Sequence, residues 1–246
     1  MFKNTLLALG TSALAIFVAG CTTTPEFDNL VVEAKYTTTP VKVDGKLDDA
    51  VWENATAYSF NSYNEACLQN GLVKFAWDKN YVYVGAELID DDVVSTSKED
   101  QSHLYKTGDV LEVFLKPSND TYYWEIYGNP EGARSSLFFP SGGRMLFPEA
   151  DKYLMPDLKV GSKIAGTLNN WTDRDCGWSV EIAIPIKELT RYGAKVNEES
   201  IWRFLIGRYN YSRWLEKAEL SGITDFKDGE KSFHYKPSFG YMKFVK

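Results

Sequence analysis

Apolar and polar residues alternate through most of the chain, and this period of two is typical of β-strands rather than helices. The clearest case is a pair of segments at 73–77 and 81–88, which flank the turn Asp78-Lys79-Asn80 and predict a hairpin. Helical patterns are brief, at 47–54 and 185–192. Further strands are expected at 110–115, 122–127, 133–139, 163–168, 178–184, 202–210 and 241–244.

These short strands are separated by Gly, Asn, Asp and Pro, which favour turns. The pattern predicts an all-β fold: a single β-sandwich of jelly-roll or immunoglobulin-like type, with antiparallel strands and one or two short helices. The sequence shows no internal repeat or linker after residue 30. We therefore expect one domain at 31–246.

Three glutamates, Glu112, Glu125 and Glu181, lie within otherwise apolar strands. A lone buried carboxylate costs several kcal/mol unless it is paired, so such residues need an explanation. We expect Glu181 to lie on a solvated face. For Glu112 and Glu125 two interpretations stay open, a solvated face or a concave surface that faces a ligand.

The first 20 residues have the features of a signal peptide: Lys3, an apolar run at 6–18, and then Val18-Ala19-Gly20-Cys21. The run is too short for a membrane span, which needs about 20 apolar residues. The last four residues resemble the lipobox of bacterial lipoproteins, which implies lipidation of Cys21. Residues 21–30 would then be a lipidated tether that anchors the protein in the bacterial cell envelope, with the outer membrane as the expected location.

Composition and charge limit the classes of binding partner that we expect. The formal net charge of −7 disfavours nucleic acid, which prefers a basic surface. Aromatic residues make up 15% of the chain, which suits either a β-sheet core or a surface on which sugar rings stack. In an oxidising compartment, Cys67 and Cys176 are a candidate disulfide pair. We expect a monomer.

The segment at 43–55, VDGKLDDAVWENA, resembles the opening of the family 9 carbohydrate-binding modules and their relatives. Other landmarks of this family follow in order along nearly the whole mature chain. They lie at 73–84, 109–115, 123–133, 178–185, 202–208 and 232–244. The resemblance implies a jelly-roll β-sandwich that binds sugars, often with bound calcium, and assists glycoside hydrolases in polysaccharide breakdown.

The resemblance also implies a site in which two aromatic side chains sandwich a sugar ring above polar groups. Tyr105 and either Phe233 or His234 would stack on the ring, while Glu112 and Glu125 would accept its hydroxyls. Two neighbours of Glu125 are further candidate contacts. They are Trp124 and Tyr127. Tyr and Phe or His replace the family's tryptophans, and Glu125 stands where a basic group is expected.

A candidate calcium site is the acidic run Asp90, Asp91 and Asp92, because hard cations take clustered carboxylates. The alternative is a solvated acidic loop that favours a turn. Two tryptophans, Trp171 and Trp214, lie in polar stretches and could be exposed ligand contacts or pack in the core.

The predicted function is a lipid-anchored carbohydrate-binding protein of the bacterial envelope, without catalysis of its own. One alternative is a glycoside hydrolase that uses Glu112 and Glu125 as paired carboxylates. A second is a b-type haem-binding electron-transfer domain, since axial ligation needs only two side chains. For haem, the candidate ligands are His103, His234, Met145, Met155 and Met242. A third alternative is a structural or partner-binding lipoprotein.

Overall fold

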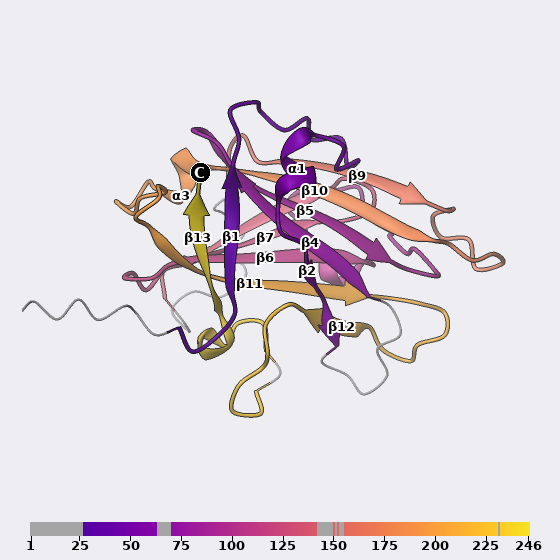
Figure 1. Ribbon diagram of the computed structural model, residues 1–246. Coiled ribbons are helices and arrows are strands. Elements are labelled where there is room, and N and C mark those ends of the chain that lie inside the picture. The colour runs from indigo at the N-terminus through magenta and orange to yellow at the C-terminus, as the bar shows by residue number, and fades with distance from the viewer. Residues whose placement is uncertain (1–26, 63–69, 142–149, 151, 153–154, 231) are drawn as a thin grey trace, which may run out of the picture.

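The computed structural model describes residues 27–62, 70–141, 150, 152, 155–230 and 232–246, which form 13 β-strands and four short helical segments (Figure 1). The strands are β1 (Val31–Tyr36), β2 (Tyr58–Ser59), β3 (Asn61–Ser62), β4 (Gly71–Trp77), β5 (Tyr81–Ile89), β6 (Val110–Pro117), β7 (Tyr123–Gly128), β8 (Arg134–Phe139), β9 (Lys159–Ala165), β10 (Gly177–Pro185), β11 (Ile201–Asn210), β12 (Glu219–Gly222) and β13 (Gly240–Val245). The helical segments are α1 (Ala50–Asn54), α3 (Ile186–Leu189), η1 (Leu104–Lys106) and η2 (Lys236–Ser238).

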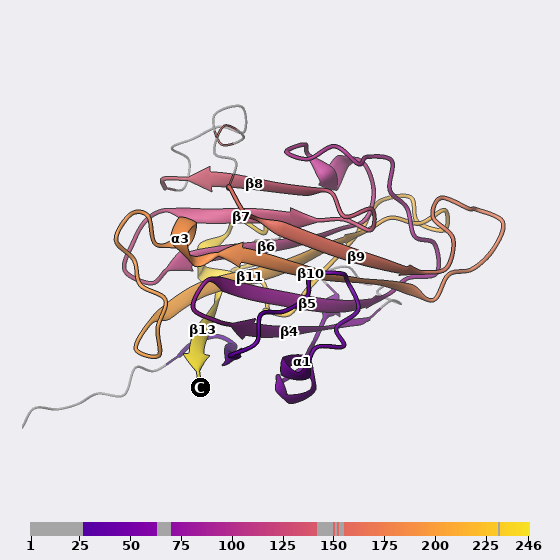
Figure 2. The same cartoon turned by 90° about the horizontal axis from the view of Figure 1, so that it is seen from above.

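The strands form two layers. Their hydrogen-bonded order is β8-β7-β6-β11-β13-β1-β4-β5-β10-β9, and β7 contacts both β9 and β10, so the two halves of this order face each other (Figure 2). We call β8-β7-β6-β11 the front sheet and β4-β5-β10-β9 the back sheet. The strands β13 and β1 connect them at one edge. The predicted β-sandwich is thus confirmed.

The main core fills the space between the sheets. Along β6, Leu111, Val113 and Leu115 point inward, and each is at most 1% exposed. Because successive side chains of a strand point to opposite faces, the residues between them point outward. Large aromatic residues such as Trp202 and Phe204 of β11 complete this inner layer.

Two smaller apolar clusters cover the outer faces of the sandwich. The front cluster includes Phe114 and Tyr123 on the strands, with Phe233 and Phe239 lying over them. The back cluster is formed where α1 and the preceding loop pack on the back sheet through Trp52. Segments outside the two sheets therefore cover part of each outer face. The sites described below lie between these segments and the sheets.

The strand pairing differs from the prediction in one respect, since β1 pairs in parallel with both β13 and β4. Parallel neighbours need long connections, and β1 is far in sequence from both partners. The strand predicted at 163–168 lies at Lys159–Ala165 instead, because Gly166, with φ of 157°, ends it. The short strand β12 had no recognisable pattern.

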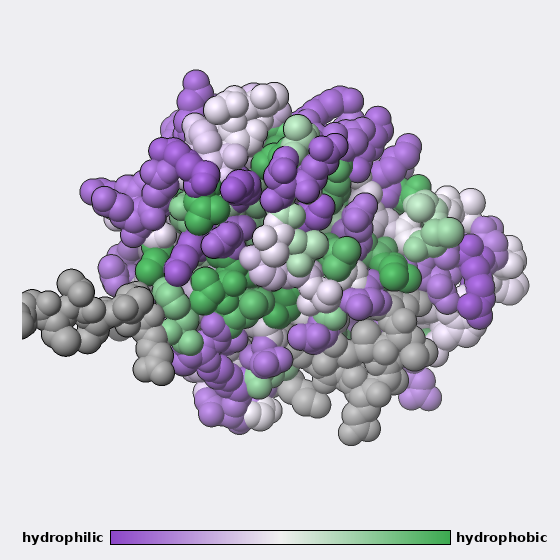
Figure 3. Space-filling view, in the orientation of Figure 1, coloured by the Kyte–Doolittle hydropathy of each residue, from purple (hydrophilic) through white to green (hydrophobic). Residues whose placement is uncertain are grey.

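On the face shown in Figure 3, apolar side chains form small patches separated by polar ones. Within the ranges that the structure describes, no helix is long and apolar enough to cross a membrane. The predicted signal peptide, the predicted lipidation site Cys21 and most of the predicted tether lie outside these ranges.

Candidate functional site

A cavity of about 260 Å³ opens on the outer face of the front sheet. Two glutamates from neighbouring strands lie in it, and most of its other lining side chains are aromatic. Pockets for drug-sized ligands measure roughly 300–1,000 Å³, so this one suits a small ligand such as a single sugar ring. It is lined by Tyr105, Glu112, Glu125, Tyr209, Leu220, Ser232, Phe233 and His234.

The floor of the pocket consists of Glu112 on β6 and Glu125 on β7. In the pairing of these strands Glu112 lies opposite Tyr127, and Glu125 lies opposite Phe114, so the two glutamates are diagonal neighbours on one face. Their exposed fractions are only 3% and 2%. Burial, reinforced by the carboxyl group of Glu125, raises the pKa of Glu112 well above its usual range.

The two glutamates differ in their partners. The hydroxyl of Tyr127 donates a hydrogen bond of 2.5 Å to Glu125 Oε1. Among the residues that the structure describes, none donates a hydrogen bond to Glu112, although its side chain is almost completely buried. Glu112 is therefore an acceptor that faces the cavity and is available to a ligand.

Three aromatic rings form a continuous wall beside this floor. The ring of Tyr209 lies 5.6 Å from that of Tyr105 and 5.7 Å from that of Phe233, measured between centroids. Phe233 lies directly over Gly207 of β11, where a Cβ atom would come within 2.7 Å of the ring. Since Gly207 pairs with Glu112, the missing side chain leaves room for an aromatic ring beside the carboxyl group.

Two successive sets of hydrogen bonds, which begin at Asp109 just before β6, hold Tyr105 in place. The buried carboxyl group of Asp109 accepts hydrogen bonds from the backbone N–H groups of Val94 and Tyr211, at 2.7 and 2.6 Å. The hydroxyl of Tyr211 then donates to the backbone carbonyl of Tyr105 at 2.6 Å. These hydrogen bonds fix η1, which carries Tyr105, against the end of β11.

His234 closes the far side of the pocket. Its Nδ1 atom lies 3.0 Å from the hydroxyl of Tyr123, and its Nε2 atom lies 3.7 Å from Glu125 Oε2. Burial, together with the nearby ammonium of Lys236, lowers the pKa of His234 to about 4. The imidazole is consequently neutral at neutral pH and contributes a polar but uncharged wall.

Five of the seven sugar-site residues proposed from the sequence meet in this pocket, namely Tyr105, Glu112, Glu125, Phe233 and His234. The other two do not line it. Trp124 points to the opposite face of β7 and packs in the core against Phe138, so its assignment as a ligand contact is wrong. Tyr127 lies on the correct face but is fully buried, and it binds Glu125 instead.

Sequence reasoning missed three lining residues, Tyr209, Leu220 and Ser232. The alternation within β11 could have identified Tyr209, because its neighbours at 202, 204 and 206 form the core pattern. Leu220 belongs to the unpredicted strand β12, and Ser232 lies in a loop. Nothing in the local sequence indicates that either one approaches Glu112.

The prediction for Glu181 is also wrong. Glu181 lies on the outer face of β10, but α1 and the preceding loop cover it and leave it 1% exposed. Its oxygens accept hydrogen bonds from Trp52 Nε1 at 2.8 Å and from the N–H groups of Asp44 and Gly45 at 2.9 and 2.8 Å. Burial raises the pKa of Glu181, and these hydrogen bonds oppose that shift.

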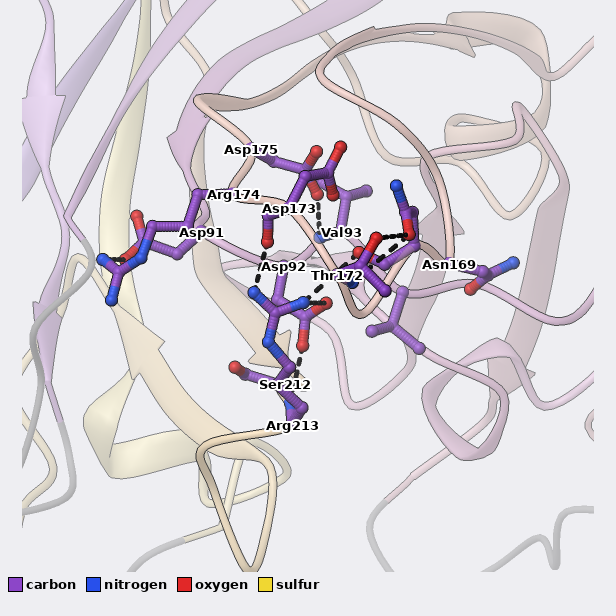
Figure 4. Close-up of polar contacts among 12 residues, drawn as sticks. Asp91, Asp92, Val93, Asn169, Thr172, Asp173, Arg174, Asp175, Ser212 and Arg213 are labelled. Carbon is purple, nitrogen blue, oxygen red and sulfur yellow. Dashed lines mark hydrogen bonds and ion pairs between the residues drawn. The ribbon is translucent and has the colours of Figure 1, made fainter.

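The acidic run at 90–92 does not fit a calcium site. Each carboxylate points to a different arginine, and Figure 4 shows this for Asp91 and Asp92. The ion pairs are Asp90 with Arg208 at 3.0 Å, Asp91 with Arg174 at 3.1 Å and Asp92 with Arg213 at 3.6 Å. Within the described ranges, no three acidic, histidine or cysteine side chains converge closely enough to hold a metal. The run instead connects three loops to one another.

The remaining candidates are dispersed. Among the haem-ligand candidates, Met155 and Met242 are buried in the main core and His234 lines the pocket, whereas Met145 lies outside the described residues. Cys176 is exposed, and Cys67, its proposed disulfide partner, also lies outside them.

The pocket is not the largest depression of the surface. A wider one of about 400 Å³ lies on the outer face of the back sheet, beside Leu72, Ile89 and Cys176. Its carboxylate, Glu87, is exposed and therefore well solvated. Buried ionisable groups beside aromatic rings mark the front pocket as the better candidate for a binding site.

Comparisons with known proteins bear on the family and the fold of the chain. Residues 43–201 match the family described as carbohydrate family 9 binding domain-like. No curated protein sequence is significantly similar to the chain. Since the family match spans well over half of the chain, it establishes membership as well as fold.

Solved structures show the same architecture. A candidate carbohydrate-binding protein from Bacteroides uniformis superposes with a TM-score of 0.72 at 13% identity, over 88% of this chain and all of its own. A family 9 carbohydrate-binding module from Caldicellulosiruptor kristjanssonii in complex with cellotriose gives 0.61 at 18% identity, over 87% of this chain and 93% of its own. The glucose complex gives the same score and identity, over 88% and 96%. The chain belongs to the family of carbohydrate family 9 binding domain-like proteins.

Proposed function

We propose that this protein binds carbohydrate in the pocket of the front sheet. The observation that carries the proposal is the arrangement of Tyr105, Tyr209 and Phe233 as an aromatic wall beside the buried acceptor Glu112. A pyranose ring has apolar C–H faces that pack on aromatic rings and hydroxyl groups at its edge that donate to carboxyl groups. The pocket offers both kinds of contact within one small cavity.

Binding can be tested by titration calorimetry with glucose and cellotriose. Replacing either Tyr105 or Phe233 by alanine removes part of the wall, and we expect the affinity to fall about tenfold or more, as for the loss of a well-packed aromatic contact. The matched control is Trp171→Ala, which removes an aromatic ring that is 74% exposed and outside the pocket. The proposal fails if no sugar binds, or if Trp171→Ala weakens binding as much as Tyr105→Ala.

We further propose that the protein is a lipoprotein that holds sugars at the bacterial envelope, beside the enzymes that degrade polysaccharides. The support is the run of small residues before Cys21 at the end of an apolar segment. Labelling with palmitate should modify the full chain, and Cys21→Ser should lose the label and leave the membrane fraction. A Cys21→Ser protein that stays in the membrane fraction would contradict this anchor.

A role beside degrading enzymes has a separate test. A strain that lacks the protein should grow more slowly on a polysaccharide than the parent strain, and equally well on the corresponding monosaccharide. Equal growth of the two strains on every polysaccharide tested would argue against a role in sugar capture.

A further inference from the structure

Two aromatic residues of the pocket wall are held in different ways. Tyr209 lies within β11, where pairing with Val110 of β6 and Leu220 of β12 fixes its backbone from both sides. Tyr105 lies in η1, a helical turn of three residues outside both sheets. Such a turn opens more readily than a central strand, so the position of Tyr105 depends on the contacts that the turn makes.

Three contacts hold this turn against the rest of the protein. Leu104 is fully buried in the front cluster. The carbonyl of Thr107, just after η1, accepts hydrogen bonds from the N–H and hydroxyl groups of Thr96 at 2.8 and 2.9 Å. Between these two points, the hydroxyl of Tyr211 donates to the carbonyl of Tyr105 at 2.6 Å. Of the three contacts, this one acts on the backbone of the wall residue itself.

The backbone of Tyr211 is fixed before it forms this contact. Its N–H group donates to Oδ1 of the fully buried Asp109 at 2.6 Å. Two residues later, the N–H group of Arg213 donates to Asp92 Oδ2 at 2.6 Å (Figure 4). A hydroxyl group on such a backbone loses little further freedom when it forms a hydrogen bond, so it can hold Tyr105 effectively.

We propose that Tyr211 is a positioning residue of the sugar site, whose hydroxyl group holds Tyr105 in the aromatic wall before a sugar binds. Tyr211 is absent from the described residues that line the cavity, so its effect has to pass through Tyr105. A wall that is already ordered raises affinity, because the ligand does not have to order it. This inference rests on the proposed function, since it concerns the affinity of the same pocket.

Tyr211→Phe tests the role directly, because it keeps the ring and removes only the hydroxyl group. In calorimetric titrations with cellotriose we expect the affinity to fall about three- to tenfold, the range for one neutral hydrogen bond. The matched control is Tyr83→Phe, which removes a hydroxyl group that donates to Asp78 at 2.9 Å on the back sheet. The control should leave the affinity unchanged, even where it lowers stability more.

A double-mutant cycle shows whether the effect passes through Tyr105. In the Tyr105→Ala background there is no ring to position, so adding Tyr211→Phe should not weaken cellotriose binding further. An equal loss in both backgrounds would mean that the hydroxyl group acts elsewhere, and it would overturn the inference.

Hydrogen exchange provides a second measurement that needs no affinity. The N–H groups of Lys106 and Thr107 donate to the carbonyls of His103 and Leu104, both at 2.9 Å. In Tyr211→Phe these two amides should exchange several-fold faster than in the wild type, and saturating cellotriose should slow them again. Exchange in Tyr83→Phe should match the wild type. Unchanged exchange in Tyr211→Phe would show that the hydroxyl group does not hold η1.

The outcomes separate this proposal from the proposed function. If the wild type binds cellotriose and Tyr211→Phe binds it as tightly, the positioning role is wrong and the proposed function stands. If the wild type binds no sugar, the proposed function is wrong and the positioning role falls with it.

Discussion

Two buried glutamates on opposite outer faces of the sandwich have closely similar surroundings. Glu181 on β10 pairs with Gly85 of β5, and Glu112 on β6 pairs with Gly207 of β11. In both cases an aromatic ring lies over the glycine. Trp52 lies over Gly85, where an added Cβ atom would be 3.0 Å from the ring, and Phe233 lies over Gly207 at 2.7 Å.

The two sites differ in the hydrogen bonds that the covering segment donates to the glutamate. The indole of Trp52 and two loop N–H groups donate to Glu181, so the back site is filled by the chain itself. The ring of Phe233 has no such donor, and Glu112 faces a cavity. One arrangement of glutamate, glycine and aromatic ring can therefore serve either stability or binding, depending on whether the covering segment provides donors.

The largest expected effect is a loss of stability when Glu181, the glutamate of the back site, is replaced. Glu181→Ala leaves three buried donors without their acceptor, and we expect the free energy of unfolding to fall by about 3 kcal/mol. Urea unfolding followed by tryptophan fluorescence measures this loss, while the sugar affinity of the folded protein should stay the same. A loss well below 1 kcal/mol would mean that water replaces the acceptor, and the contrast between the two sites would disappear.

An intermediate effect is expected at the glycines. In Gly207→Ala the new methyl group would force the ring of Phe233 to shift, at a cost of about 1–2 kcal/mol, and sugar affinity should fall several-fold. Gly85→Ala is the matched change on the back sheet, where the methyl group would press on Trp52. It should lower stability but not affinity, as thermal unfolding and calorimetry would show. Equal affinity losses in both variants would count against the front pocket as the binding site.

The smallest effect concerns pH. Because the pKa of Glu112 is raised in the folded protein, the native state keeps this proton while the unfolded chain releases it. Above the ordinary value of 4.5, the stability of the wild type should therefore fall with rising pH relative to Glu112→Gln, by at most about 1.4 kcal/mol per pH unit, until the folded pKa is passed. At neutral pH we therefore expect Glu112→Gln to be the more stable of the two proteins.

Urea unfolding of both proteins over a pH series measures this difference. A difference between the two proteins that does not vary with pH would show that Glu112 titrates normally, and that the pocket floor is better solvated than its burial indicates.

Local patterns were sufficient for the fold and for part of the site. Alternation located most strands and placed Glu112 and Glu125 within them, because burial on one face imposes a period of two. The same rule shows why Trp124 was assigned wrongly, since adjacent strand residues cannot share a face. Tyr105, Phe233 and His234 came from resemblance to the family, because they lie in connecting segments without a regular pattern.

Other features of the structure depend on strand register and loop packing, which no short segment of the sequence encodes. The pairing of Gly207 with Glu112 brings Tyr209 to the pocket, but these two paired residues are 95 positions apart in sequence. Likewise, Glu181 is buried only because a loop more than 130 residues earlier folds over it. The three arginine partners of the run at 90–92 come from two distant loops and from β11.

The two chain segments that meet at the base of β1 and β13 have a mechanical consequence. Asn29 donates to the carbonyl of Ser238 at 3.0 Å, and Tyr241 donates to Asp28 at 2.8 Å, so the start of the fold is tied to the segment that carries Phe233 and His234. If the chain is anchored through its N-terminus and the pocket holds a polymer, tension would pass from this wall of the pocket to the anchor over a few residues. The packed interior between the two sheets then lies largely outside the path of the force.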